Sequence, residues 1–297
     1  MTRRYAIPLF CLALLASAPS GAQMNVKKLA DGVWASTTTN GANVGWFVDG
    51  EDVIAVDSGP NPQEARNILA KIKETAGKPV RFVIITHSHG DHAGGAGEFA
   101  AAGARVIASD NAAGPLMTAM QGAKAAPKAE FLAVATRLQF LGGRRFEIDY
   151  LGPAHTDGDL LVALPDDKIL FSGDIAVNGY PYMRTKGLDP RNWLRILTSL
   201  QNLPFDQLVP GHGAIGPRDG LASSLSYVGR VLEIGRKLAE EKVPDADLER
   251  KLHEPANMIE NVAVTEDHVE NIRAVYQFEK ERLAKVSPTP KPASKGR

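Results

Sequence analysis

The feature that most restricts the fold of this chain is the hexapeptide HSHGDH at 87–92, directly after the apolar run VRFVIIT at 80–86. An apolar run that meets a glycine-containing turn is typical of a buried strand ending in a loop. Histidines at alternate positions of an extended segment, here His87 and His89, point the same way and can hold one ion. The turn that Gly90 permits can direct the last two side chains to a second ion. Four potential ligands in six residues therefore favour a metal site over isolated structural histidines.

Strand-like and helix-like segments alternate along the chain, which indicates an α/β fold. The first half has strand-like runs and helical segments at 33–39, 44–50, 52–59, 62–77 (helical), 80–86, 96–102 (helical) and 104–109. The second half repeats the pattern at 144–152, 159–165, 168–174, 192–203 (helical) and 205–213. We therefore predict two sheets sandwiched between helices, with a site where strand ends meet. Two later helical segments, 221–242 and 267–286, are amphipathic, and we expect them to cover a sheet face.

The first 22 residues have the pattern of a secretory signal. Arg3 and Arg4 precede a mostly apolar stretch at 6–18, and small residues end at Ala22. The stretch is shorter than the roughly 20 apolar residues that a membrane span needs, and proline interrupts it. We therefore expect cleavage after Ala22, no stable membrane anchor, and a periplasmic or secreted protein.

Cysteine content and charge exclude several classes of function. Cys11 is the only cysteine and lies in the signal, so the exported domain has no disulfide, thiolate ligand or cysteine nucleophile. The 34 basic and 34 acidic residues balance, which disfavours nucleic acid as a partner. We expect residues 23–286 to form one domain and residues 287–297, which contain three prolines and three cations, to be a disordered basic tail.

Three further polar residues stand at the ends of apolar strands, each close to glycine. They are His155 in GPAHTDGD, Asp174 in LFSGDI and His212 in VPGHG. Together with the residues of 87–92 they make five histidines and two aspartates. This set has enough nitrogen and oxygen donors for two divalent metals, with positions left for water.

These segments resemble the metallo-β-lactamase superfamily, whose signature is HxHxDH followed by a His, an Asp and a last His. The resemblance covers roughly residues 26–240 and includes Asp57 in VDSG. It implies an αββα sandwich, a single domain with the metals at one edge between the sheets. It also implies that one metal is held by His87, His89 and His155, that a second is held by Asp91, His92 and His212, and that Asp174 bridges both.

The resemblance implies an exported binuclear zinc hydrolase. Two Zn²⁺ ions, or alternatively Fe or Mn, would generate a bridging hydroxide that attacks a small-molecule ester, thioester, lactone or amide, including a β-lactam. We assign Asp91 a catalytic role in orienting the hydroxide besides its role as a ligand. Asp57 is expected to support a metal-bound histidine from behind.

Two alternatives remain open within this resemblance. A true metallo-β-lactamase is consistent with export, but such enzymes usually carry Cys or Ser where this chain has Asp174. An iron-dependent redox enzyme, similar to persulfide dioxygenases, is the other. His92 and His212 complete a second metal site and no flavin domain follows, which favours hydrolysis.

Residues beyond the metal ligands carry weaker signals. The loop at 175–182 supplies Asn178 and Tyr180 as candidate substrate contacts, and Arg184 can meet a substrate carboxylate. We interpret the alanine-rich segment at 111–128 as a surface helix rather than a lid over the site. The tryptophans are expected to pack in or near the core, and His253 and His268 are excluded from the site.

Overall fold

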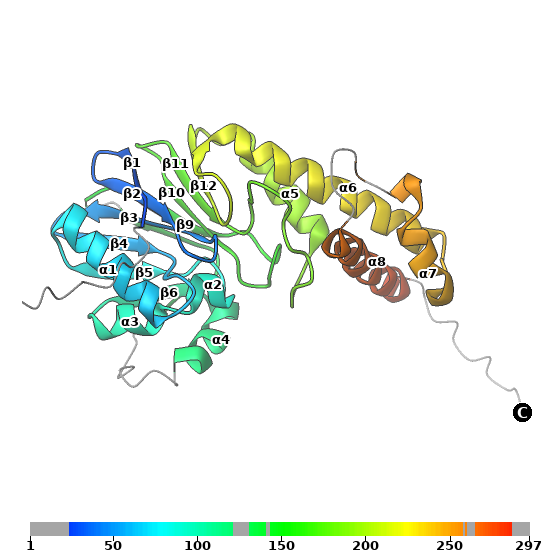
Figure 1. Cartoon of the computed structure of the whole chain (residues 1–297), viewed down its shortest axis with the longest axis horizontal. Coiled ribbons are helices and arrows are strands. Elements are labelled where there is room, and N and C mark those ends of the chain that lie inside the picture. Colours follow the sequence, from blue (N-terminus) through cyan, green and yellow to red (C-terminus); the bar gives the residue numbers. More distant parts are fainter. Residues whose placement is uncertain (1–23, 121–130, 141–142, 258, 260–264, 287–297) are drawn as a thin grey trace, which may run out of the picture.

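Two β-sheets pack face to face, and helices lie on their outer faces (Figure 1). The structure is a computed structural model that describes residues 24–120, 131–140, 143–257, 259 and 265–286. The expected signal at 1–22 and the expected tail at 287–297 lie outside the described residues. The predicted αββα sandwich is confirmed.

The first sheet contains seven strands in the order β1-β2-β3-β4-β5-β6-β7. Strands β1 to β4 pair antiparallel, whereas β4 to β7 pair parallel. Their bounds are β1 Val26–Ala30, β2 Val33–Thr37, β3 Asn43–Asp49, β4 Asp52–Val56, β5 Val80–Ile84, β6 Arg105–Ser109 and β7 Phe131–Val134. Helices α1 (Pro62–Ala76), α3 (Ala96–Ala101) and α4 (Asp110–Met120) cover its outer face.

Helix α1 shows how local sequence sets the boundaries of these elements. The Asn61 side chain accepts a hydrogen bond from the Glu64 N–H, and Pro62 occupies the first turn, where its missing N–H costs nothing. Gly77 ends the helix in the left-handed conformation, with φ of 66°, and its N–H donates to the Lys73 carbonyl. The predicted end of this helix at Gly77 is confirmed.

The second sheet contains six strands in the order β13-β12-β11-β10-β9-β8. Only β11 and β12 pair parallel, and the helix between them, α5 (Pro190–Leu200), packs its apolar side on this sheet. The strand bounds are β8 Arg137–Phe140, β9 Phe146–Tyr150, β10 Leu160–Leu164, β11 Ile169–Gly173, β12 Gln207–Pro210 and β13 Gly216–Pro217.

Alternating side chains divide the apolar residues between the layers. In β4, Val53 and Ala55 point to the helices, while Ile54 and Val56 point to the space between the sheets. The sheets approach so closely at Gly45 in β3 that a Cβ atom there would lie 2.1 Å from a ring carbon of Phe171. This tight inner layer aligns the strand ends of both sheets at one edge.

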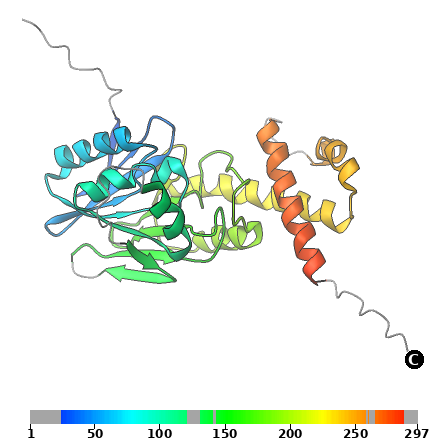
Figure 2. The same ribbon diagram turned by 90° about the horizontal axis from the view of Figure 1, so that it is seen from below.

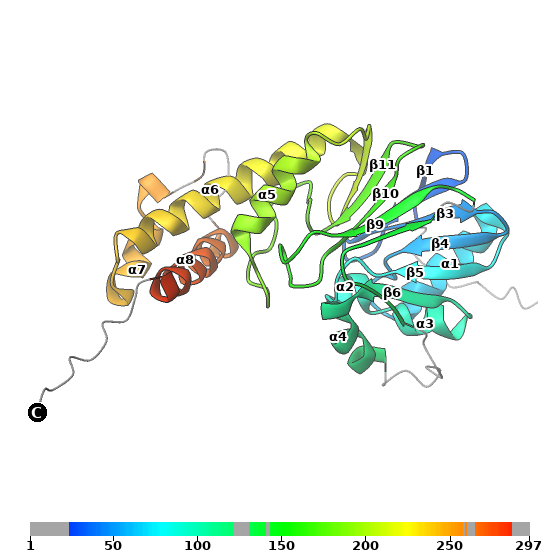
Figure 3. The ribbon, with the colours of Figure 1, turned by 180° about the vertical axis from the view of Figure 1, so that it is seen from behind.

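The carboxyl-terminal helices are α6 (Leu221–Glu240), α7 (Asp245–Leu252) and α8 (Glu266–Val286). We expected two of them to cover a sheet face, and this expectation is wrong for α8. Helix α6 packs on α5 and continues beyond the sheets, where α7 and α8 pack against it (Figures 1 and 3). Helix α8 crosses α6 close to Gly235, where a Cβ atom would lie 2.7 Å from Val275 (Figure 2).

Several elements had no counterpart in the sequence prediction, namely β1, α2 (Gly90–Ala93), β7, β8, β13 and α7. The surface helix expected at 111–128 is present as α4 up to Met120, and the rest of that segment lies outside the described residues. Trp46 and Trp193 are fully buried and Trp34 is partly buried, as predicted. In the part of the chain that is described, no helix has the length and apolar character that crossing a bilayer requires.

The contact between the sheets at Gly45 generates a stability prediction. Gly45→Ala places a methyl group against Phe171 and should lower the free energy of unfolding by about 1–3 kcal/mol, because the inner layer has no room for it. Gly216→Ala is the matched control, since nothing lies within 4 Å of its Cβ position, and it should change stability by less than about 0.5 kcal/mol. Chemical denaturation of both variants measures the difference, and equal stabilities would contradict the close packing.

Candidate metal centre

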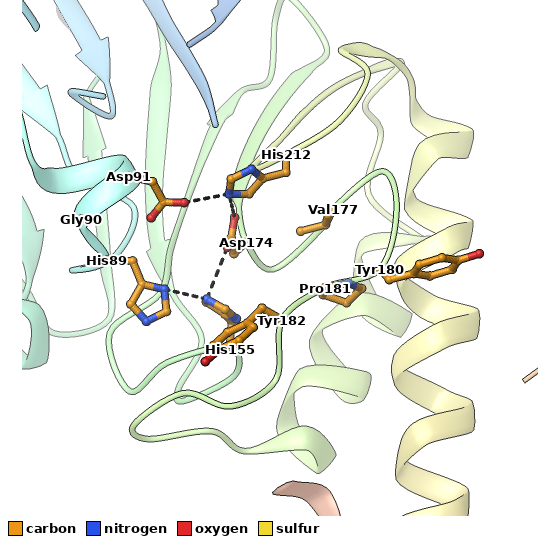
Figure 4. Close-up of a pocket in the computed structure, with 10 residues that line it drawn as sticks. All are labelled: His89, Gly90, Asp91, His155, Asp174, Val177, Tyr180, Pro181, Tyr182 and His212. Atoms are coloured by element: carbon orange, nitrogen blue, oxygen red, sulfur yellow. Dashed lines mark hydrogen bonds and ion pairs between the residues drawn. The ribbon is translucent and has the colours of Figure 1, made fainter. Parts of the chain in front are cut away.

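Seven polar side chains converge at the edge of the sandwich where strands from both sheets end. Figure 4 shows five of them, His89, Asp91, His155, Asp174 and His212. His87 follows β5, His155 lies between β9 and β10, Asp174 follows β11, and His212 follows β12. The short helix α2 (Gly90–Ala93) follows His89 and carries the remaining two residues, Asp91 and His92. Because carboxyl ends of neighbouring parallel strands meet at one edge of a sheet, these separated segments reach the same place.

The carboxylate of Asp174 lies between two groups of histidines. Its Oδ2 is 3.4 Å from His155 Nε2 and 3.9 Å from His87 Nε2. Its Oδ1 is 3.3 Å from His92 Nε2 and 3.7 Å from His212 Nε2. Each oxygen of one carboxylate therefore faces a different pair of imidazoles.

The side chains form two clusters, and within each cluster the potential ligand atoms all lie within 4.8 Å of one another. In the first cluster, His89 Nδ1 is 3.1 Å from His155 Nε2. In the second, His212 Nε2 is 3.0 Å from an oxygen of Asp91 and 3.3 Å from His92 Nε2. The first cluster is His87, His89, His155 and Asp174, and the second is Asp91, His92 and His212.

The two clusters have the nitrogen and oxygen atoms that a divalent cation would bind. His87 Nε2 and Asp174 Oδ1 are buried and make no hydrogen bond among the described residues. Buried polar atoms without partners are rare in folded proteins. Nitrogen and carboxylate oxygen lone pairs that converge in this way are the donors that zinc and similar metals take.

The loop that carries His212 is fixed by the first sheet. At the start of β3, the Asn43 N–H donates to the Gly211 carbonyl at 2.7 Å, and its side-chain amide donates to the carbonyls of Pro210 and Gly213 at 2.8 and 2.9 Å. Only glycine fits at position 211, because a Cβ atom there would lie 1.9 Å from Asp174 Oδ1. A residue of one sheet thus positions a cluster residue of the other.

Asp57 contacts the ring nitrogen of His92 that faces away from Asp174, and its support of a metal-bound histidine stays a prediction. Asp57 is buried and adopts φ of 61°, a left-handed conformation that costs energy and that functional sites often retain. Its carboxylate accepts hydrogen bonds from the N–H and hydroxyl of Thr86 at 2.8 and 2.9 Å, and it lies 2.8 Å from His92 Nδ1. Since a carboxylate can only accept, Nδ1 carries a proton and Nε2 points to Asp174.

The loop of His155 is held by a second buried acid. Asp159 accepts hydrogen bonds from the N–H and the hydroxyl of Thr156, both at 2.7 Å. Burial raises the pKa of Asp159 to about 7 in spite of these bonds. The Thr185 hydroxyl donates to the His155 carbonyl, which ties the loop to the segment after Asp174.

Burial and neighbouring charges shift the pKa values of the cluster residues. Burial lowers the pKa of His87 well below its ordinary value and lowers that of His155 to about 4. Burial opposes the charged form of His92 as well, but Asp57 and Asp174 raise the pKa of His92 well above its ordinary value. For Asp174, burial is outweighed by His92 and its neighbours, so the pKa lies well below the usual range. Near neutral pH, the first cluster thus contains neutral imidazoles and an ionised carboxylate, which are the metal-binding forms.

A pocket of about 620 Å³ opens over the clusters. Tyr180, one of the three expected substrate contacts, lines it together with Val177, Pro181 and Tyr182, besides residues of the clusters. Asn178 and Arg184 do not line it.

Those two residues have other partners. The Asn178 N–H donates to the His212 carbonyl at 2.9 Å, so this residue supports the cluster from behind. Arg184 forms an ion pair with Asp267, and its guanidinium carbon lies 4.6 Å from the centre of the Tyr182 ring. Of the three expected substrate contacts, the pocket lining therefore includes Tyr180 and lacks the other two.

The sequence interpretation missed the residues that hold the loops, notably Asn43, Thr86 and Asp159. The usable signal for Thr86 is a short polar residue at the end of an apolar run, next to His87. Asp159 stands directly before the apolar strand β10, four residues after His155. Asn43 has no such signal, because its partners lie more than 160 positions away. His253 and His268 lie outside both clusters, as expected.

Comparisons with known proteins agree with this geometry. The sequence model of the metallo-beta-lactamase superfamily matches residues 37–212. The chain is 29% identical over 196 residues to 2,4-dinitroanisole O-demethylase subunit alpha from Nocardioides sp. (strain JS1661), an alignment that covers 64% of this chain and 57% of that protein. It is 27% identical over 164 residues to metallo-beta-lactamase type 2 from Elizabethkingia meningoseptica, with 53% and 64% covered. The chain therefore spans less than two thirds of the length of either curated relative.

Solved structures show the same fold. A metallo-beta-lactamase from Pontibacter korlensis superimposes with a TM-score of 0.58 and 26% identity, covering 70% of this chain and 99% of that one. One from Hirschia baltica superimposes with a TM-score of 0.59 and 22% identity, covering 69% and 97%, which supports the fold alone. Because the superfamily pattern covers more than half of the sequence and spans the segments that converge here, this chain belongs to the metallo-beta-lactamase superfamily.

Proposed function

We propose that this protein is an exported binuclear zinc hydrolase that cleaves an ester, thioester, lactone or amide bond in a small molecule. The observation that carries the proposal is the position of Asp174, whose two oxygens face two separate ligand clusters beneath an open pocket. A single metal would use one of these clusters and leave the other without a role.

The residues divide into two ligand sets that share one member. The first set is His87, His89 and His155, the second is Asp91, His92 and His212, and Asp174 belongs to both. A pair of zinc ions supplies Lewis acidity toward the scissile group and a water molecule that ionises near neutral pH.

Asp91 is the cluster residue best placed to act on the attacking water. Its carboxylate lines the pocket and is about one-third exposed, unlike the buried Asp174. Burial opposes ionisation, but the hydrogen bond from His212 outweighs it and lowers the pKa of Asp91. An ionised Asp91 can orient the attacking water and accept its proton while it serves as a ligand.

The pocket has a polar side and an apolar side, and this difference restricts which substrates fit. One side is formed by the clusters, and the other by Val177, Pro181 and the two tyrosine rings. A substrate that places its reacting carbonyl on the cluster side and an apolar group on the opposite wall meets both surfaces. We therefore assign an acyl substrate with an apolar substituent.

β-Lactam hydrolysis is a second candidate, favoured by likeness to proteins named metallo-beta-lactamases. Asp174 stands against it, since lactamases usually carry Cys or Ser at the equivalent position. Other relatives are named for different substrates, a dinitroanisole and a linear primary alkyl sulfate. The shared ligand set is therefore compatible with several leaving groups.

Export rests on the residues of 1–22 and predicts that the processed protein begins at Gln23. Mass spectrometry of protein recovered from the periplasm of an expressing Gram-negative cell tests this. A species that retains the first 22 residues in the cytoplasm would contradict export.

Metal content and turnover test the hydrolase directly. The wild-type protein should bind about two equivalents of zinc and hydrolyse at least one member of a panel of thioester, lactone, phosphodiester and β-lactam substrates. Asp174→Ala should lose more than about a hundredfold in turnover and bind less zinc, while it remains folded, because the ligands lie on loops.

Asp206→Ala is the matched control for that variant, because Asp206 directly precedes β12 and its exposed carboxylate pairs with Lys168 at the surface. It should retain both activity and zinc. One equivalent of iron with oxygen uptake, or full turnover by Asp174→Ala, would overturn the hydrolytic assignment.

Asp57 generates a separate prediction about metal affinity. Asp57→Asn removes the acceptor that orients His92 and should weaken zinc binding by about 10- to 100-fold, with a smaller loss of stability. Asp52→Asn, on the same strand β4 but paired with Arg81 at the surface, should bind zinc as the wild type does. Competition with a zinc-sensitive dye measures both affinities, and equal values would refute a role for Asp57 behind His92.

A further inference from the structure

Residues 180–184 run along one side of the pocket, and we call these five residues, Tyr180, Pro181, Tyr182, Met183 and Arg184, the wall segment. The first three line the pocket, and Met183 is fully buried behind them. In Figure 4, Tyr182 is drawn beside His155, whereas Tyr180 points away from the clusters. The position of this segment therefore determines the width of the pocket beside the first cluster.

Asn271 of helix α8 is buried against the wall segment and makes three hydrogen bonds. Its side-chain oxygen accepts from the Met183 N–H at 2.9 Å, and its amide nitrogen donates to the Pro181 carbonyl at 2.9 Å. The same nitrogen donates to the hydroxyl of Tyr227 in α6, also at 2.9 Å. The acceptor and both donors of the amide are satisfied, so its orientation is fixed.

A second residue of α8 acts on the other end of the wall segment. Asp267 forms an ion pair with Arg184, and the Arg184 guanidinium lies over the Tyr182 ring. The position of a pocket ring thus depends on an exposed carboxylate in α8.

Helix α6 holds the loop before the wall segment. The Ser224 hydroxyl accepts from the Val177 N–H at 2.8 Å and lies 2.7 Å from the Val177 carbonyl, to which it donates. The Tyr227 ring lies 5.2 Å from the Tyr180 ring. Both helices lie outside the region that matches the superfamily, residues 37–212, so this support is added to the common fold.

We propose that α8 belongs to the substrate-recognition machinery of this protein. Asn271 and Asp267 are positioning residues that hold the wall segment against the pocket and thereby determine how large an apolar acyl group fits beside the first cluster. The substrate class in this inference rests on the proposed function, whereas the positioning of the wall segment does not.

Steady-state kinetics of the zinc-loaded full chain test the proposal with two probes, 4-nitrophenyl acetate and 4-nitrophenyl phenylacetate. Asn271→Ala should change the ratio of the two KM values by about tenfold, because the wall segment loses two buried hydrogen bonds. The zinc content should remain that of the wild type, and kcat for the two esters should change by less than the KM ratio does. Asp267→Asn should shift the ratio in the same direction by about two- to threefold, since it breaks one exposed ion pair.

Glu270→Gln is the matched control on α8, because Glu270 pairs with Arg273 on the same helix. It should leave both KM values unchanged. If Asn271→Ala does not fold, the surface variant Asp267→Asn decides the test. An unchanged KM ratio in the folded variants, or an equal fall in kcat for both esters that is larger than the change in this ratio, would overturn the proposal, since a merely structural role predicts such results.

Hydrogen exchange separates this inference from the proposed function. In Asn271→Ala, the Met183 amide should exchange faster while residues 87–92 keep their protection. A wild-type protein that hydrolyses neither ester would count against ester hydrolysis, and the exchange result would then decide the positioning role alone. Unchanged exchange at Met183, or faster exchange throughout the domain, would refute it.

Discussion

The buried carboxylate of Asp174 is the group on which the arrangement of the site depends. It is only 7% exposed, and an ionised carboxylate at such depth is strongly unfavourable unless opposite charge or polar partners surround it. The fold provides four imidazoles around its two oxygens. His87 follows β5 of the first sheet, whereas His155 and His212 lie on loops of the second sheet, between β9 and β10 and after β12. The carboxylate therefore requires both sheets to end at one edge. The close fit of Gly211 and the contacts of Asn43 serve this convergence.

Much of the fold and most of the centre followed from the sequence, for a physical reason. Buried parallel strands appear as continuous apolar runs, and the residue that follows such a run lies at the edge where other strands end. His87, Asp174 and His212 each stand in this position, so their convergence could be anticipated without any contact information. Asp57 likewise follows an apolar strand, β4, and lies at the same edge.

The remaining features depend on contacts between residues distant in sequence. Strands β7 and β8 are edge strands of four residues each, too short for an apolar pattern to distinguish them. The amphipathic pattern of α8 indicated a buried face but not its partner, which is α6 instead of a sheet. Arg184 was predicted to meet a substrate, yet Asp267, 83 positions away, neutralises it. Asn271 had no local signal, because a polar residue in a helix is usually exposed to solvent.

The central claim, that Asp174 lies between two metal ions, is tested most directly by anomalous diffraction from crystals of the zinc-loaded protein on both sides of the zinc absorption edge. The account predicts two anomalous peaks roughly 3.5–4 Å apart, with one oxygen of Asp174 near each or a single oxygen shared by both. One peak confined to the first cluster, with Asp91 and His212 paired only to each other, would contradict it.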